Sequence, residues 1–482
     1  MSAANQYTFQ PSILWHDYES WGAQPQKDHP NQFAAVRTDL DLNPIGESIN
    51  WMCQIPNDYL PHPQACLITG ITPQKSLRDG MIEAQFMRQI NEQMSQPGTC
   101  VAGYNNIRFD DELTRFSLYR NFINPYAREW QNGNSRWDII DMVRACYALR
   151  PEGINWVHND DGKPSFKLER LSQANEIEHL DAHDALSDVY ATIAMAKLIK
   201  QQQPRLYDYL FSLRLKNKVA EQFNMATKSP LVHISSKLPS ENGCCTWIAP
   251  LCPHPSNKNA IICINLNLPV EPLLDLSVEE LQRKLYQRSE DMAPNEQRLP
   301  VKLVHLNKCP VVAPAKTLSQ ENAERLNIDR EQCLKNLKWL QQQTGLEQKL
   351  SALYETSEQQ ELDADHALYS GGFLSNADQQ VCAQIQDADP ASLDSFNNKF
   401  EDPRLNTLLF RYRGRNYPNT FTAQELEKWQ RHRHFRLTDP QSPASLTLEK
   451  YMWEVEQLLA SNSNNPGHIS ILKDLYRYAQ QL

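Results

Sequence analysis

Strand-length and helix-length segments alternate over residues 12–200 of this 482-residue chain. Short apolar runs predict β-strands, and longer segments with apolar residues every three or four positions predict helices. The expected strands lie at 13–15, 33–38, 48–53 and 100–103. The expected helices lie at 81–94, 110–121, 137–149, 168–175 and 182–202. This alternation predicts an α/β domain with a mixed sheet, whose last helix ends before Pro204.

The pattern changes beyond residue 203, and the chain is longer than the roughly 300 residues that one hydrophobic core supports. We therefore expect domains at 1–203, 204–354 and 366–482, joined by a segment at 355–365. The second domain should be a small β-barrel with helical additions, since strand-like runs separated by Pro, Asn and Ser dominate it. Its expected strands are 231–235, 246–249, 260–268 and 301–306, and its helices 278–288 and 330–343.

The last domain is predicted to be helical, with helices at 423–434, 446–459 and 469–482. The segment 355–365 before it carries five acids and no base. That composition indicates either an acidic linker or a solvated helix face.

Composition is that of an ordinary soluble protein, with 40% hydrophobic and 22% charged residues. The net charge of −10 argues against nucleic-acid binding only on average, because local patches decide such binding. No apolar run approaches the length of about 18 residues that a membrane helix needs. The N-terminus lacks the apolar core of a secretion signal, so we expect a cytoplasmic protein with reduced thiols.

The eleven cysteines raise the question of a metal site. Cys244, Cys245 and Cys252 lie close to His254 in the sequence, but their spacing matches no structural zinc pattern. Ordinary thiols in a β-rich segment are the favoured interpretation.

Two carboxylates follow the first expected strand. Asp17 and Glu19 are two residues apart, so on an extended chain both side chains point to the same face. Adjacent carboxylates repel each other unless a cation lies between them, and hard oxygen ligands suit Mg²⁺ or Mn²⁺. A solvated strand end is the alternative interpretation of this pair.

A second acidic pair, Asp110 and Asp111, opens the helix expected after the strand at 100–103. Either carboxylate could simply cap that helix, because helix N-termini favour anions.

The third acidic segment begins the helix expected at 182–202. Asp188 lies about one turn into this helix on the face turned to the sheet, where a carboxylate is costly unless a metal or a partner compensates its charge. His183 lies at or before the first turn and can reach the same site. The alternative is a capping network of Asp181, His183 and Asp184.

In this order and spacing, the three segments resemble the motifs of the DEDD (DnaQ-like) 3′–5′ exonuclease superfamily, in its histidine-bearing branch. The chain is also similar, more closely, to the exodeoxyribonuclease I family of bacteria. The stretches that carry this similarity are 16–22, 103–112, 134–138, 144–156, 301–310 and 410–418, and so extend over nearly the whole chain.

The resemblance implies a ribonuclease H-like α/β nuclease domain with a mixed sheet, then an SH3-like β-barrel and an all-α C-terminal domain, arranged in a C shape around single-stranded DNA. It implies a monomeric enzyme that degrades single-stranded DNA processively from its 3′ end to nucleoside 5′-monophosphates, in DNA repair and recombination.

The resemblance also assigns roles in the site. Asp17, Glu19, Asp110 and Asp188 match the four acids that hold two Mg²⁺ ions, with Mn²⁺ possible, and His183 matches the general base. Two divalent ions about 4 Å apart serve both ends of an in-line displacement, and an imidazole can accept a proton near neutral pH.

DNA contacts are expected from cations that meet phosphates and aromatic rings that stack on bases. The candidates are Arg115, Tyr126, Trp130, Arg144 and Lys167. Lys167 stands where the family suggests an arginine, so a bidentate phosphate contact is lost there. For Tyr126 and Trp130, burial in the core is the alternative.

Two further surfaces are expected to bind partners. Residues 401–436 hold eight bases and four acids, interleaved with Tyr412, Tyr417 and Trp429, which favours a surface facing DNA or a partner over a solvated helix face. The family resemblance adds the acidic C-terminal tail of single-stranded-DNA-binding protein as a partner, and Arg150 is the candidate to receive its terminal carboxylate.

Two other functions remain open from the sequence. A 3′–5′ exoribonuclease would use the same site, because recognition of the 2′ position is not visible in these residues. A non-catalytic single-strand-binding protein would use the acids only structurally.

Overall fold

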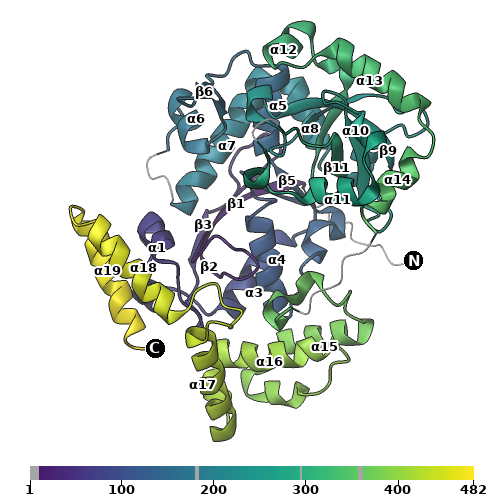
Figure 1. The fold of residues 1–482 in the computed structure, drawn as a ribbon. Coiled ribbons are helices and arrows are strands. Elements are labelled where there is room, and N and C mark those ends of the chain that lie inside the picture. The colour runs from purple at the N-terminus through teal and green to yellow at the C-terminus, as the bar shows by residue number, and fades with distance from the viewer. Residues whose placement is uncertain (1–9, 180–183, 294–295, 356–361) are drawn as a thin grey trace, which may run out of the picture. The chain divides into compact units, whose positions relative to one another are not determined.

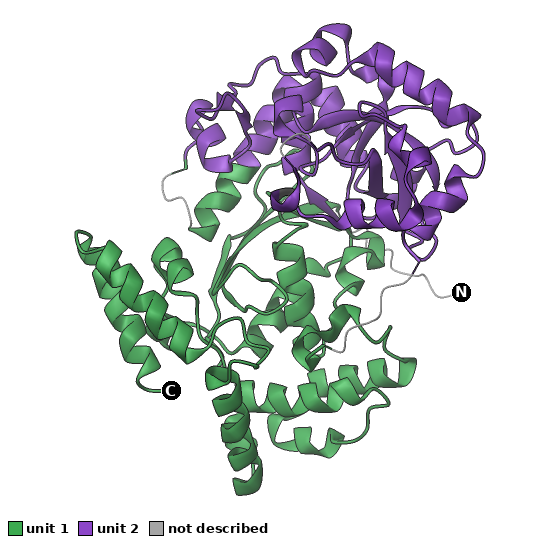
Figure 2. Ribbon diagram, viewed as in Figure 1, with its two compact units in different colours: residues 1–135, 179–192, 359–482 green, residues 136–178, 193–358 purple. Residues whose placement is uncertain are grey.

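The computed structural model describes residues 10–179, 184–293, 296–355 and 362–482 (Figure 1). The chain forms two compact units, which Figure 2 colours separately. Unit 1 contains residues 1–135, 179–192 and 359–482, and unit 2 contains 136–178 and 193–358. The chain passes between the units within strand β5 (Ser135–Asp138) and again within helix α7 (Ala185–Gln202).

Unit 1 is built on a mixed sheet, as the sequence predicts. Its strands are β1 (Ser12–Ser20), β2 (Pro30–Thr38), β3 (Ile49–Met52) and β4 (Thr99–Gly103), in the order β3-β2-β1-β4. Strand β1 pairs antiparallel with β2 and parallel with β4, so both of its edges are hydrogen-bonded. It runs to Ser20, which places Asp17 and Glu19 within the strand and not beyond its end.

Helices α3 (Glu83–Met94) and α4 (Asp110–Arg120) supply apolar side chains to the core of this sheet (Figure 1). Leu14 and Val101 from the strands pack in one cluster with Phe86 and Ile90 of α3 and Leu113 of α4. The sequence did not predict two short helices of unit 1, α1 (Pro63–Thr69) and α2 (Pro73–Asp79).

The C-terminal segment of unit 1 is helical, as expected. Its helices are α15 (Asn376–Asp387), α16 (Pro403–Asn416), α17 (Ala423–Thr438), α18 (Leu448–Ser461) and α19 (Pro466–Ala479). They do not form a separate core. Helices α18 and α19 pack beside α1 (Figure 1), where Tyr451 and Leu472 share a cluster with Trp21 and Leu60.

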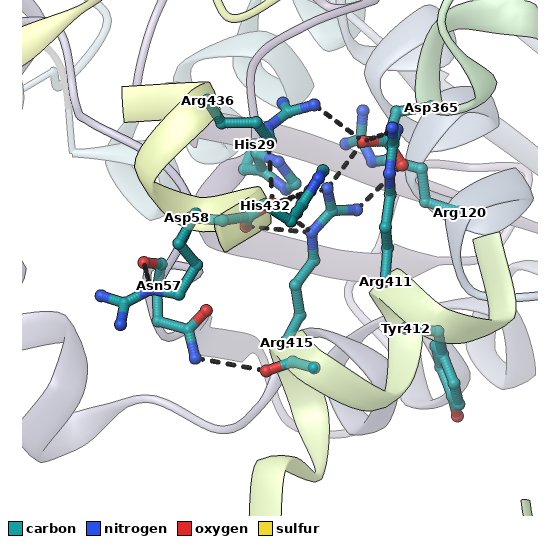
Figure 3. Close-up of polar contacts among 12 residues, drawn as sticks. His29, Asn57, Asp58, Arg120, Asp365, Arg411, Tyr412, Arg415, His432 and Arg436 are labelled. Atoms are coloured by element: carbon teal, nitrogen blue, oxygen red, sulfur yellow. Dashed lines mark hydrogen bonds and ion pairs between the residues drawn. The ribbon is translucent and has the colours of Figure 1, made fainter. Parts of the chain in front are cut away.

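Within unit 1, a cluster of buried ion pairs also joins the N-terminal part of the chain, at Asp58, to the C-terminal part, at residues 365–436 (Figure 3). We call Asp58, Asp365, Arg411, Arg415 and Arg436 the arginine–aspartate cluster. Arg415 donates to Asp58 (Nη2 to Oδ2, 2.8 Å) and to Asp365 (Nη2 to Oδ2, 2.6 Å). Arg411 and Arg436 donate to Asp365 at 2.9 and 3.2 Å.

Burial opposes ionisation of Asp58 and Asp365, but the surrounding guanidinium groups outweigh it and hold the pKa of both carboxyls well below the usual range. These side chains are therefore charged and mutually compensated, which is the condition under which buried ions are tolerated.

This cluster corrects two expectations from the sequence. The end of the supposed acidic linker is not solvated, because Asp363 and Asp365 pair with Arg411. The basic segment 401–436 is in large part interior: Arg411, Arg413 and Arg436 are buried in ion pairs, and Tyr412 and Trp429 are buried aromatic residues. Composition alone does not tell a basic surface from a set of internal ion pairs.

Unit 2 contains a five-stranded antiparallel sheet in the order β11-β10-β9-β8-β12. Its strands are β8 (Leu231–Ile234), β9 (Cys245–Pro253), β10 (Ala260–Asn265), β11 (Val301–His305) and β12 (Val311–Pro314). Four of the five were predicted, and β12 was not. Trp137 lies in β5, so helix α5 (Ile140–Leu149) begins three residues later than the expected 137–149.

Unit 2 also contains further helices. They are α6 (Leu168–Ala174), α8 (Pro204–Ser212), α9 (Lys216–Ala220), α10 (Pro272–Asp275), α11 (Val278–Tyr286), α12 (Gln320–Arg325), α13 (Arg330–Gln342) and α14 (Leu346–Ala352). A short hairpin of β6 (Val157–His158) and β7 (Pro164–Ser165) precedes α6. In the part of the chain that the structure describes, no helix has the length and apolar character needed to cross a membrane.

The arginine–aspartate cluster generates a stability prediction. Asp365→Ala should lower the free energy of unfolding by about 3–5 kcal/mol, because it leaves three buried guanidinium groups without a carboxylate that they now share. Chemical denaturation measures this change. Asp394→Ala, at an exposed aspartate of the same segment, is the matched control and should change stability by less than about 0.5 kcal/mol. Equal stability of the two variants would contradict the role given to the cluster.

Candidate functional site

The side chains of Asp17 and Glu19 leave the same face of β1, as their spacing predicts. Tyr18, between them, points to the opposite face, where its ring packs 4.8 Å from that of Phe33. Strand β1 lies between β2 and β4. Asp17 and Glu19 are both paired with β2, whereas the pairing with β4 covers Ser12–Trp15 and ends just before them.

Asp110 lies at the start of helix α4, which follows the neighbouring parallel strand β4. The chain leaves β4 at Gly103, turns, and begins α4 at Asp110, whose carboxylate therefore lies in the positive first turn of a helix. A Cβ on residue 103 would lie 2.9 Å from the carbonyl oxygen of His16, so only glycine allows the turn to pass this close to β1.

Asp188 comes from the first turn of α7. Asp184 precedes that helix and accepts a hydrogen bond from the backbone N–H of Ser187, so part of the alternative capping network is present. Ligand oxygens of Asp17, Glu19 and Asp188 all lie within 4.8 Å of one another. Among the residues that the structure describes, this is the only group of three or more candidate metal-ligand side chains.

The pKa values of this group show how poorly its charges are compensated. Burial raises the pKa of Asp17 well above its usual range, and the carboxylates of Asp110, Glu19 and Asp188 raise it further. Burial, with Asp188 and Asp110 next in importance, raises the pKa of Glu19 to about 8. Asp110 is thus an electrostatic neighbour of the two β1 carboxylates, as predicted.

A divalent cation fits this donor set. Three carboxylate side chains converge, their oxygens are the hard ligands that Mg²⁺ and Mn²⁺ prefer, and the raised pKa values reflect a repulsion that a cation would remove.

The predicted general base, His183, lies outside the described residues. A different histidine occupies a place beside the acids: Nε2 of His179 lies 2.5 Å from Oδ1 of Asp188. Sequence reasoning missed His179, because nine residues separate it from Asp188 and no motif pairs the two positions.

Asp111 has a structural role in place of the capping that the sequence suggested for one of the pair. Its carboxylate accepts a hydrogen bond from Arg128 (Nη2 to Oδ1, 3.0 Å), and both side chains are fully buried. Neither aspartate is the N-cap of α4, since that position is Phe109, which makes no side-chain capping bond.

Three predicted DNA contacts lie in unit 1. The guanidinium of Arg115 is already engaged by Glu129 and Glu112, each at 2.7 Å, and its Cζ lies 5.5 Å from the ring centre of Tyr126. Tyr126 is partly buried, whereas Trp130 is 66% exposed, which excludes a core role for the tryptophan.

Three other predicted contacts lie in unit 2. Arg144 pairs with Asp141 at 2.6 Å, with its Cζ 5.6 Å from the ring centre of Phe166. Lys167 is exposed at the start of α6. Arg150 is also exposed, and it donates to the carbonyl oxygen of Thr317 at 3.2 Å.

Cys244, Cys245 and Cys252 of the cysteine-rich segment are buried. They do not form a group of ligands with His254. The imidazole of His254 packs instead 4.7 Å from the ring of Tyr354.

Comparison with protein families matches three consecutive parts of the chain. Residues 14–196 match the family described as Exonuclease, 214–356 the Exonuclease I SH3-like domain, and 362–482 the Exonuclease I C-terminal domain. The fold class predicted from the sequence is thereby confirmed: an α/β nuclease domain, an SH3-like domain and a helical C-terminal domain.

Relatives and solved structures agree with these matches. The exodeoxyribonucleases I of Escherichia coli and Haemophilus influenzae are each 46% identical to this chain, over 98% of both chains. The structure of E. coli exonuclease I in complex with a dA16 oligonucleotide superposes with a TM-score of 0.94 at 46% identity, covering 98% of this chain and 100% of that one. A structure of SSB/exonuclease I with the inhibitor CFAM has a TM-score of 0.90 at 45% identity, over 98% and 100% of the chains. With such identity over nearly its entire length, the chain belongs to the exodeoxyribonuclease I family, and it is a nuclease that hydrolyses DNA.

Proposed function

We propose that this protein degrades single-stranded DNA from the 3′ end, releasing nucleoside 5′-monophosphates, at a divalent-metal site formed by Asp17, Glu19, Asp110 and Asp188. The observation that carries the proposal is the convergence of the Asp17, Glu19 and Asp188 carboxylates, where burial and the neighbouring acids raise the pKa of Asp17 and Glu19. Membership of the exodeoxyribonuclease I family favours DNA over RNA as the substrate, and an active enzyme over a non-catalytic binding protein.

The cations would be Mg²⁺, with Mn²⁺ as an alternative, and when bound they would activate a water and stabilise the leaving 3′-oxygen. The residues of the chain would bind the cations and accept a proton. Asp17, at the centre of the cluster, is the candidate to bridge two ions, and Glu19, Asp110 and Asp188 would complete their coordination. His183 would accept the proton of the attacking water.

Substrate contacts are proposed from both units. Trp130 exposes enough ring surface to stack on a base, and Tyr126 offers part of a ring. Lys167 is exposed, so its ammonium group can meet a phosphate as a point charge. Arg115 and Arg144 would have to exchange carboxylate partners for phosphate, so we expect them to contribute less.

Arg150 is the proposed contact for the C-terminal tail of single-stranded-DNA-binding protein. It is an exposed cation, and a relative of known structure is described as an SSB/exonuclease I structure. Action as a monomer, in DNA repair and recombination, stays a prediction from the family. A cytoplasmic location and the domain boundaries at 203, 354 and 365 stay predictions from the sequence pattern.

The metal site generates a prediction about activity. Asp17→Asn should lower DNA hydrolysis by at least about 10²-fold, the scale of losing one group that stabilises the transition state, because it removes the central anionic ligand. Release of labelled mononucleotides from single-stranded DNA measures it. Glu47→Gln, at an exposed acid of the same unit, should retain normal activity. Hydrolysis by Asp17→Asn at the rate of the control would refute the assignment.

The raised pKa of Glu19 generates a prediction about stability. Without metal, the unfolded chain releases this proton at a lower pH than the folded chain, so Glu19 destabilises the fold increasingly as pH rises from about 4.5 to about 8. Glu19→Gln cannot ionise. In EDTA its melting temperature should therefore exceed that of the wild type by a margin that grows over this pH range.

Thermal unfolding of both proteins at a series of pH values tests this expectation. Saturating Mg²⁺ should reverse the order, since only the wild type gains the full binding energy of the cation. A difference in melting temperature that is constant with pH in EDTA would show that Glu19 is not held among uncompensated carboxylates.

A further inference from the structure

His179 makes a contact with the candidate metal site that the catalytic scheme does not use. Its Nε2 lies 2.5 Å from Oδ1 of Asp188, and its side chain is only 5% exposed. Both residues belong to unit 1. When Asp188 is ionised its oxygen can only accept, so Nε2 then carries the proton; Nδ1 is buried without a hydrogen-bond partner among the described residues.

We propose that His179 is a positioning residue that holds Asp188 in the orientation required for cation binding. A carboxylate has two oxygens, so one can accept from His179 while the other serves as a metal ligand. The inference rests on the proposed function, because it assumes that Asp188 binds a cation. His179 itself touches neither cation nor substrate in this scheme.

The need for such a partner follows from the charges around Asp188. This carboxylate is part of a group in which Glu19 and Asp17 lie close enough to repel it. The hydrogen bond from His179 opposes rotation of this repelled side chain away from the ligand geometry. Hydrogen-bond partners of metal ligands typically change metal affinity by about 10- to 100-fold when removed.

The experiment measures metal binding apart from catalysis. Mn²⁺ binding to the full-length protein, followed by electron paramagnetic resonance, should weaken by about 10- to 100-fold in His179→Ala. His179→Gln, which keeps a side-chain N–H donor, should bind Mn²⁺ with nearly wild-type affinity. Glu178→Ala, at the exposed neighbouring position, is the matched control and should also bind normally.

Kinetics provide the second readout. The Mg²⁺ concentration for half-maximal activity should rise in His179→Ala by the same factor as the Mn²⁺ affinity falls, while the KM for DNA stays unchanged. Thermal unfolding in EDTA identifies any variant that fails to fold. If His179→Ala fails to fold, the comparison of His179→Gln with the wild type provides the test.

The outcomes separate the two proposals. If the wild type does not bind Mn²⁺, the proposed metal site is wrong. If the wild type binds it and His179→Ala binds equally well, only the role of His179 is wrong. If His179→Ala binds Mn²⁺ more tightly, His179 competes with the cation for Asp188, which likewise overturns the positioning role.

Discussion

Repulsion among partly buried carboxylates is the constraint on which the candidate site depends. Asp17 and Glu19 share one face of a central strand, and burial together with Asp110 and Asp188 raises their pKa values. A fold keeps such an arrangement only if rigid elements hold it and a ligand compensates the charge. The pairing of Asp17 and Glu19 with β2, the turn at Gly103 and the first turn of α7 provide that rigidity.

The arginine–aspartate cluster shows the opposite solution in the same unit. Asp58 and Asp365 are buried more deeply than Asp17, yet guanidinium groups hold their pKa values low, whereas the neighbours of Asp17 are acids. Burial alone therefore does not mark a functional site. The distinguishing feature is whether the protein supplies the opposite charge itself or leaves that to a ligand.

Local spacing was enough to predict that the acids on β1 and at the starts of α4 and α7 come together, but not the internal partners of charged residues. The i, i+2 pair on β1 and the acids at the starts of α4 and α7 follow from strand and helix geometry, so the sequence located them. The pairing of Asp365 with Arg411 and Arg415 spans about fifty residues, and the pairing of Asp58 with Arg415 spans 357. No local pattern reports such contacts, which is why an interior cluster was interpreted as an acidic linker and a basic surface.

The same limit explains the smaller differences. Helices α1 and α2 have seven residues each, too few for a periodic pattern to separate them from a loop, although each begins with a proline typical of helix starts. His179 was missed because its contact with Asp188 exists only in the folded chain. The family resemblance, by contrast, rests on motifs over the whole length, and so predicted the order of the three folds without any of these contacts.

Digestion of 5′-end-labelled single-stranded DNA tests the central claim most directly, with duplex DNA and RNA of the same sequence in parallel and with Mg²⁺ or EDTA. The account predicts that the labelled single-stranded DNA shortens progressively from its 3′ end in Mg²⁺, that EDTA stops this, and that duplex and RNA are degraded much more slowly. Equal degradation in EDTA, or early release of the 5′ label as a mononucleotide, would contradict a metal-dependent 3′–5′ exonuclease at this acidic site.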